Sequence, residues 1–202
     1  MSAADEPTGA AGGGAFRVPG RIRILPLAPE TPSQALLATL AADLRDRLGT
    51  RVEVEGPEEA DESWWTEHRS QLVSNAIVDS LIERHPLVTD ARDEDCAAEW
   101  ILGATAADLR GGSRDFVFGE AALGGAWAVI STARFGAEGS PRLRRRLLAE
   151  ALHELGHLAG LEHCDRPGCL MTPAVDVADV DRRGLVLCVG CSLGPRTVAD
   201  GP

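Results

Sequence analysis

The chain has 202 residues, 44% of them hydrophobic, and its 20 basic and 31 acidic side chains give a net charge of -11. A chain of this size can bury one hydrophobic core, so we expect one domain, with a monomer favoured. The excess of acidic residues repels phosphate backbones and anionic lipids, which argues against nucleic acid and membranes as partners.

The chain begins with a segment that is rich in Gly and Ala. Residues 1–20 predict a disordered tail, and residues 21–202 a single folded domain. The tail has neither the basic start nor the apolar stretch of a signal peptide, and no later segment has the roughly 18 apolar residues that span a bilayer. We therefore expect a cytoplasmic protein.

The first elements after the tail are a strand, a helix and a second strand. Charged and apolar residues alternate in Arg21–Leu27 (RIRILPL), as they do in a half-buried strand. The next segment has apolar residues at helical spacing, and we expect Thr31 as its N-cap, Pro32 as its first residue and Gly49 as its end. Arg51–Gly56 (RVEVEG) then predicts a short strand.

A second helix and three strands follow. The spacing of apolar residues predicts an amphipathic helix over Trp65–His85, ended by Pro86. The side chains expected to be buried are Leu72, Ile77, Leu81 and Ile82. The apolar run Trp100–Ala104 predicts an interior strand, and Asp115–Phe118 and Trp127–Ser131 predict two more. The segment GEAALGG between the last two strands is rich in Gly and predicts a turn.

The longest helix is expected over Pro141–Gly160. Its apolar residues recur every three or four positions and mark the face toward the core: Leu143, Leu147, Ala151, Leu155 and Leu158. Four arginines near its start indicate a solvated face and are assigned no function: Arg142, Arg144, Arg145 and Arg146. The elements add up to an α/β or α+β fold, with a mixed, twisted sheet of about five strands, three main helices and an irregular C-terminal segment.

The sequence HELGHLAGLEH, which begins in the longest helix and runs past its expected end, has the spacing of a metal site. Residues four apart lie above one another on a helix, so His153 and His157 can bind one ion. Gly160 suits the end of the helix and lets the chain turn, which brings in His163 as a third ligand. Three histidines leave a fourth position for water, which is typical of catalytic zinc. Glu154 points about 100° further round the helix and is the candidate general base.

Three of the five histidines lie within this motif, whereas His68 and His85 stand singly and are interpreted as surface residues. The chemistry that the motif permits is hydrolysis of an amide. Zinc polarises the carbonyl and lowers the pKa of its bound water toward about 7, while Glu154 takes the water's proton and passes it to the leaving amine. The chain has no Tyr, so a phenol cannot stabilise the oxyanion.

Four of the five cysteines lie in the last quarter of the chain. They form two pairs that suit a structural zinc with four thiolate ligands: Cys164, Cys169, Cys188 and Cys191. The alternatives are two disulfides or four free thiols. Cys96 stands apart and is interpreted as an unreactive thiol. We therefore expect two zinc ions per chain, one catalytic and one that pins the C-terminal segment.

The combined pattern HELGHLAGLEHC, Cys169, Met171 and CVGC resembles the archaemetzincin family of zinc metallopeptidases, within the metzincin clan. The segments RSQLVSNAIVDSL, ILGATAADL, FVFGEA and AVISTARF are similar to the family as well, so the resemblance covers most of the chain from Ile22. It implies a compact metzincin-like domain whose active-site helix lies beneath the substrate cleft. It also implies that Met171 forms the turn under the zinc ligands, and that DFVF is the edge strand along the cleft, where an extended peptide could pair.

The leading hypothesis is a peptidase that acts on peptides or proteins, as an aminopeptidase or on small peptides. The alternative is a zinc-stabilised peptide-binding module with little or no turnover, because no sequence feature identifies a specificity pocket. A zinc-dependent ribonuclease with three histidine ligands is a third hypothesis. The acidic charge and Glu154 directly after the first histidine argue against it.

Overall fold

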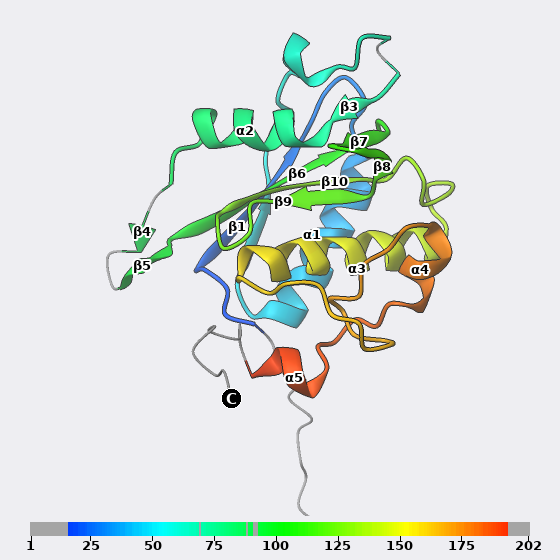
Figure 1. Cartoon of the computed structure of the whole chain (residues 1–202). Helices are drawn as coiled ribbons and strands as arrows, with labels where there is room; N and C mark the ends of the chain where they lie inside the picture. The colour runs from blue at the N-terminus through cyan, green and yellow to red at the C-terminus, as the bar shows by residue number, and fades with distance from the viewer. Residues whose placement is uncertain (1–15, 69, 88, 91–92, 194–202) are drawn as a thin grey trace, which may run out of the picture.

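The computed structural model describes residues 16–68, 70–87, 89–90 and 93–193, so residues 1–15 of the expected tail lie outside it. A five-stranded sheet forms its centre (Figure 1). The strands are β1 (Arg21–Pro26), β2 (Arg51–Val54), β6 (Glu99–Thr105), β9 (Gly119–Ala121) and β10 (Trp127–Ser131). Their order is β2-β1-β6-β10-β9, and every neighbouring pair is parallel except β10 and β9.

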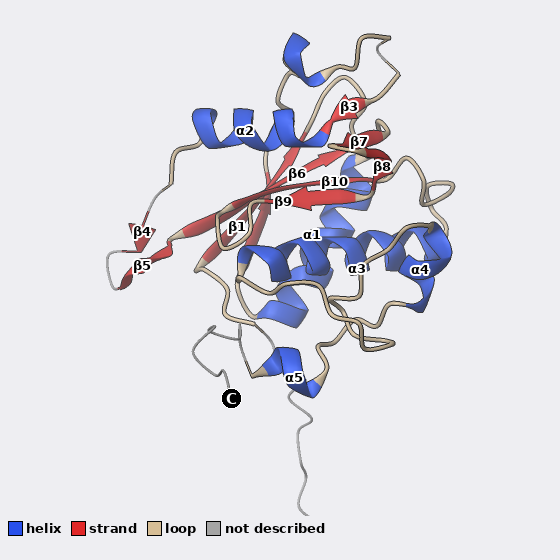
Figure 2. Ribbon diagram, viewed as in Figure 1, coloured by secondary structure: helices blue, strands red, loops and turns tan. Residues whose placement is uncertain are grey.

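Two long helices cover one face of this sheet and a shorter helix covers the other (Figure 2). Helices α1 (Gln34–Leu48) and α3 (Pro141–Leu158) pack against each other and share the larger hydrophobic core with the sheet. Helix α2 (Ser74–Arg84) lies over a smaller core on the opposite face. Since both faces are covered, the central strand β6 is buried from Trp100 to Thr105, as its continuous apolar run predicts.

The remaining elements are short. They are the 3-10 helix η1 (Glu62–Trp64), the strands β3 (Leu72–Val73), β4 (Thr89–Asp90), β5 (Asp93–Ala97), β7 (Leu109–Gly111) and β8 (Arg114–Val117), and the helices α4 (Val177–Arg182) and α5 (Val189–Ser192). Strands β3, β7 and β8 form a three-stranded sheet, and β4 pairs with β5. Among the helices of the described ranges, none has both the length and the apolar composition to cross a bilayer. The mixed fold and the five-stranded sheet confirm the predicted fold class.

The start of α1 differs from the prediction. Ser33, and not Thr31, is the N-cap, and its side chain accepts a hydrogen bond from the Leu36 backbone N–H at 3.2 Å. The Ser33 backbone N–H donates to Glu138 at 2.9 Å, a contact across 105 positions. Thr31 and Ser33, on either side of Pro32, are both residue types that cap helices. The one that forms the cap, Ser33, is also the one that bonds to Glu138. The predicted end at Gly49 is confirmed, with the left-handed conformation that suits Gly.

The helix predicted over Trp65–His85 is wrong in its first half. Its beginning forms a loop and the short strand β3, and α2 starts only at Ser74. The backbone N–H of Leu72 donates to Asp108 at 2.9 Å, and β3 pairs with β7. These partners lie far along the chain, so periodicity alone could not reveal them. Ile77 and Leu81 are buried as expected, whereas Ile82 is exposed.

The glycine-rich segment GEAALGG is not only a turn. Its first three residues form β9, the edge of the five-stranded sheet, with Gly119 opposite Ile130. DFVF contributes instead to β8, which ends at Val117 and is the edge of the small sheet. The chain therefore passes from one edge strand directly into another, because Phe118 turns between them.

The C-terminal segment is more regular than expected, and the arginines of α3 are less solvated. Arg146 binds Asp181 at 2.6 Å with only 13% of its side chain exposed, and Arg145 donates to the carbonyl of Val180 at 3.1 Å. Arg144 reaches Asp43 of α1. Three of the four arginines therefore join α3 to its neighbours. The spacing of residues along one helix does not reveal such contacts with other elements.

Candidate active site

Helix α3 positions the first two histidines of the motif. Ser140 caps its start by accepting a hydrogen bond from Leu143 N–H at 3.1 Å, Pro141 is the first residue, and the predicted core face is buried. His153 and His157 are one turn apart, and their ring centroids lie 4.7 Å from each other. Their Nε2 atoms are separated by 3.2 Å. The helix thus holds two imidazoles toward one point.

The third histidine arrives from the turn after α3. Gly160 has φ of 82°, a left-handed conformation that Gly adopts without strain, and it redirects the chain as predicted. The ring of His163 then lies 5.3 Å from that of His153 and 4.8 Å from that of His157. One ligand atom of each histidine lies within 4.8 Å of the others. His68 is exposed and His85 pairs with Glu58, so both stay outside this cluster.

Backbone carbonyls fix which nitrogen of each helical histidine faces the site. Nδ1 of His153 bonds to the carbonyl oxygen of Leu170 at 2.9 Å, and Nδ1 of His157 to that of Leu161 at 2.7 Å. A carbonyl can only accept, so Nδ1 carries the proton and Nε2 keeps its lone pair. This arrangement is common around metal-binding histidines, whose orientation depends on such outer bonds.

The surroundings of the histidine cluster lower the pKa of each of its members. Burial lowers the pKa of His153 well below the usual value, and it lowers the pKa of His157 to about 4. The pKa of His163 is lowered as well, first by burial and then by the positive charge of Arg114. Zinc binds neutral imidazole, so the cluster is in the required form at neutral pH.

The distances fit zinc. Tetrahedral zinc with Zn–N bonds of about 2.0–2.1 Å holds its nitrogen ligands about 3.3 Å apart, and the two Nε2 atoms of α3 are separated by 3.2 Å. Three nitrogen ligands of this kind leave one position for water or substrate. The donor set and its spacing therefore suit a catalytic zinc.

Glu154 lies beside the histidines, in contact with the sheet edge. It is buried, and a Cβ atom added to Gly119 of β9 would stand only 2.7 Å from its Oε1. Gly119 therefore leaves the room that the Glu154 side chain occupies, a role that the sequence pattern did not indicate. Burial first, and then the neighbouring carboxyl of Glu150, raise the pKa of Glu154 well above its usual value.

Met171 is fully buried beneath the helical ligands. A Cβ atom added to Gly156 would stand 2.5 Å from its Sδ, so Gly156, between the two helical histidines, lets Met171 approach the helix. The backbone N–H of Cys164 donates to the Met171 carbonyl at 2.9 Å. Met171 therefore packs against the active-site helix between its two histidines.

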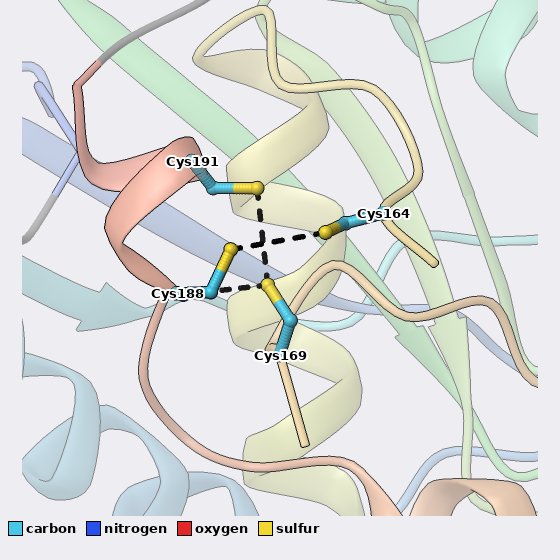
Figure 3. A group of neighbouring side chains, drawn as sticks. All are labelled: Cys164, Cys169, Cys188 and Cys191. Carbon is cyan, nitrogen blue, oxygen red and sulfur yellow. Dashed lines mark hydrogen bonds between the residues drawn. The ribbon is translucent and has the colours of Figure 1, made fainter. Parts of the chain in front are cut away.

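The four clustered cysteines converge at a second point, next to the histidines along the chain (Figure 3). Cys164 follows His163 directly, while Cys188 is the N-cap of α5 and Cys191 lies within it. The Sγ atoms of Cys164 and Cys188 are 3.8 Å apart, as are those of Cys169 and Cys191. Zn–S bonds of about 2.3 Å in a tetrahedron place sulfurs about 3.8 Å apart, so this cluster also fits zinc.

The alternative of two disulfides is wrong, because a disulfide needs sulfurs about 2.05 Å apart and these four thiols are free. A hydrogen bond from the Cys191 backbone is the main factor that lowers the pKa of Cys188, whereas burial raises the pKa values of Cys169 and Cys191. The side chain of Cys96 lies outside the described residues.

A cavity of about 710 Å³ opens over the histidines and Glu154. Its walls come from β9, from the β7–β8 hairpin with Arg114, and from Pro173 and Ala174 after the Met171 turn. Glu150 and Arg183 also line it, and they form a buried ion pair of 2.6 Å that the sequence analysis missed. In the sequence, Glu150 could have been noticed because it lies one helical turn before Glu154. Nothing in the sequence pattern pointed to Arg183.

Comparison with known proteins places the chain in a family. The model of peptidase family M54 matches residues 41–194. The archaemetzincin of Archaeoglobus fulgidus is 44% identical over 91 residues, which cover 45% of this chain and 56% of that protein. The archaemetzincin of Methanocaldococcus jannaschii is 38% identical over 129 residues, or 61% of this chain and 65% of that protein. Each match thus spans less than two thirds of the curated relative.

Solved structures agree with this result over a longer range. The crystal structure of the Archaeoglobus fulgidus archaemetzincin, complexed with malonate, has a TM-score of 0.73 and 32% identity, and it covers 86% of this chain and 98% of that one. The archaemetzincin of Methanopyrus kandleri has a TM-score of 0.70 and 25% identity, with 92% and 95% covered. The chain therefore belongs to peptidase family M54, the archaemetzincin family of zinc metallopeptidases.

Proposed function

We propose that this chain hydrolyses peptide bonds with a zinc ion held by His153, His157 and His163, and with Glu154 as the general base. One observation carries the proposal: three imidazoles converge with their ligand atoms within 4.8 Å of one another, two of them at zinc spacing, beside a buried carboxyl group and within a single cavity. This combination of metal ligands, base and open space is what metal-assisted hydrolysis requires.

When bound, zinc supplies Lewis-acid catalysis, because it polarises the scissile carbonyl and makes water nucleophilic at neutral pH. The carboxylate of Glu154 accepts the proton of the attacking water as the new C–O bond forms. It then delivers that proton to the amine nitrogen as the C–N bond breaks. A pKa raised by burial suits this double role, because the same group must first bind the proton and then release it.

We further propose that the four clustered cysteines hold a second, structural zinc, which gives two zinc ions per chain: Cys164, Cys169, Cys188 and Cys191. Four sulfur ligands leave no position for a substrate. Their role is to fasten the segment around α5 to the end of the active-site helix. Met171 supports the histidine ligands from below without binding metal, since its side chain packs against Gly156.

The substrate class follows from the cavity. A volume of about 710 Å³ accommodates a short peptide, and strand β9 offers an edge with which an extended peptide can pair. This role was expected of DFVF, of which Val117 and Phe118 also line the cavity. Glu120 and Glu162 add carboxylates to its lining, which supports binding of a free amino terminus and aminopeptidase action. A set of fluorogenic peptides with free and acetylated amino termini tests this preference, and equal rates would contradict it.

The first experiment measures zinc per chain by elemental analysis, for the wild type and for His157→Ala, in protein purified without chelators or a histidine tag. We expect a fall from two zinc ions to one, with the cysteine site still occupied. Cys188→Ser is the matched variant for the other site. One zinc that survives the His157 substitution would contradict a metal site at the histidines.

The second experiment separates a peptidase from a peptide-binding module without turnover. Glu154→Gln keeps the size of the side chain but cannot accept the proton, so we expect kcat to fall by about 10²- to 10⁴-fold with zinc content unchanged. Peptide affinity should remain within twofold of the wild type. A wild-type protein that binds peptides and cleaves none, with Glu154→Gln indistinguishable from it, would favour the binding module.

A further inference from the structure

A buried ion pair on the cavity wall has no part in the chemistry proposed above. Nη1 of Arg183 lies 2.6 Å from Oε2 of Glu150, and the two side chains are only 2% and 4% exposed. Removing two charges from water is costly, so apolar side chains of similar volume often give equal or greater stability. A charged pair retained beside a catalytic base therefore points to a role in function.

Glu150 is connected to the base. It lies one helical turn before Glu154 on α3, so the two side chains share a face of the helix, and both line the cavity with the histidines. The negative charge of Glu150 also contributes to the raised pKa of Glu154. The position of the Glu150 side chain therefore bears directly on that of Glu154.

Arg183 is connected to the turn beneath the metal ligands. Its Nε donates to the carbonyl of Thr172 at 2.9 Å, directly after Met171. Its own carbonyl accepts from Nη2 of Arg145 at 2.6 Å, which fixes the backbone of Arg183 against α3. The guanidinium of Arg183 thus links Glu150 on the active-site helix to the turn at Met171.

We propose that Glu150 and Arg183 are positioning residues for Glu154. Arg183 holds the Glu150 side chain in place through their ion pair, and Glu150 in turn orients the carboxyl group of Glu154 toward the substrate. Because Arg183 also bonds to Thr172, the carboxyl group of Glu154 keeps a fixed position relative to the turn that supports the histidines. The inference rests on the proposed function, in which Glu154 is the base.

The test replaces both charges at once. Glu150→Leu with Arg183→Met removes the ion pair without leaving a buried charge unpaired, so the fold is expected to survive. With the fluorogenic peptide that the wild type cleaves best, we expect kcat to fall about 100-fold while KM stays within twofold. Zinc content and the midpoint of thermal unfolding should stay close to those of the wild type. Arg183→Lys, which keeps the charge, should retain part of kcat.

A matched control uses the other ion pair between the same parts of the chain. Arg146→Met with Asp181→Leu removes a link from α3 to α4, two residues before Arg183, but neither residue lines the cavity. This control should keep wild-type kcat. An equal loss of kcat in the control would overturn the proposal, because any loosening of α4 would then explain the effect.

A coupling measurement shows whether the pair acts through Glu154. If it does, Glu150→Leu with Arg183→Met should cause no further loss of kcat in a Glu154→Gln background. Unchanged kcat in the paired variant, or loss of zinc from the histidine site, would overturn the inference while leaving the proposed function intact. Wild-type kcat in Glu154→Gln would instead refute the proposed function, and the inference with it.

Discussion

The histidine cluster and the cysteine cluster are joined by a short stretch of chain but are built in different ways. Two of the three histidines belong to one buried helix, which is packed on the sheet and capped by Ser140. The cysteines come from a loop and from the short helix α5, and three of the four are only partly buried against the core, whereas Cys169 is buried within it. We therefore expect the fold to organise the histidine site before metal binds, and the proposed second zinc to hold together the segments that carry the cysteines.

Removal of both metals should give the largest effect and tests this difference directly. Structural zinc contributes about 10 kcal/mol to the folding of small zinc domains, so we expect a strong chelator to unfold the segment from Cys164 to Ser192. The five-stranded sheet and α3 should stay folded, because their core needs no ligand. Hydrogen exchange measured by mass spectrometry distinguishes the two regions. Global unfolding on chelation would contradict the contrast.

A substitution at the sheet edge should disturb the histidine side alone. In Gly119→Ala, the added Cβ would stand 2.7 Å from Oε1 of Glu154, so the carboxyl group must move. Because a shift of about 1 Å can cost 100-fold in rate, we expect kcat to fall by 10- to 100-fold with both zinc ions retained. Gly20→Ala is the control, since nothing lies within 4 Å of its Cβ position. Full activity in Gly119→Ala would show that Glu154 tolerates displacement.

Loss of the cysteine site should weaken the histidine site without destroying it. The carbonyl that orients His153 belongs to Leu170, which lies between Cys169 and Met171. Loss of such outer support typically costs 10- to 100-fold in metal affinity, and we expect this reduction in Cys188→Ser. Competition with a chromophoric chelator measures it. Val189→Ala, an exposed change next to Cys188, should have no effect, and unchanged affinity in Cys188→Ser would show that the two sites are independent.

The smallest expected effect concerns the helix that carries the histidines. Ser140→Ala removes the N-cap of α3 and should lower the free energy of unfolding by about 1 kcal/mol. Urea denaturation measures this change. Because the cap lies far from the ligands along the helix, zinc content and kcat should stay unchanged. A loss of zinc from the histidine site would mean that the first turn of α3 affects the position of the ligands at its other end.

The sequence alone was sufficient to predict the elements that depend on local periodicity. The apolar spacing of α3, the run Trp100–Ala104 and the segment Trp127–Ser131 predicted elements that the structure contains. Spacing alone also predicted that the histidines of the motif, and the clustered cysteines, would each come together, as they do in the structure. A helix brings residues four apart together by its own geometry, so convergence of His153 and His157 needs no knowledge of the rest of the fold.

Only the tertiary structure decided which distant groups meet around those residues. Gly119 is required by the side chain of Glu154, and Gly156 by that of Met171, although both looked like ordinary glycines in the sequence. The false start of the second helix has the same origin, because Leu72 takes its hydrogen-bond partner from Asp108. The ion pair of Glu150 with Arg183 spans 33 positions. Periodicity reports contacts within a helix or strand, whereas these contacts depend on how the elements pack, which local pattern does not encode.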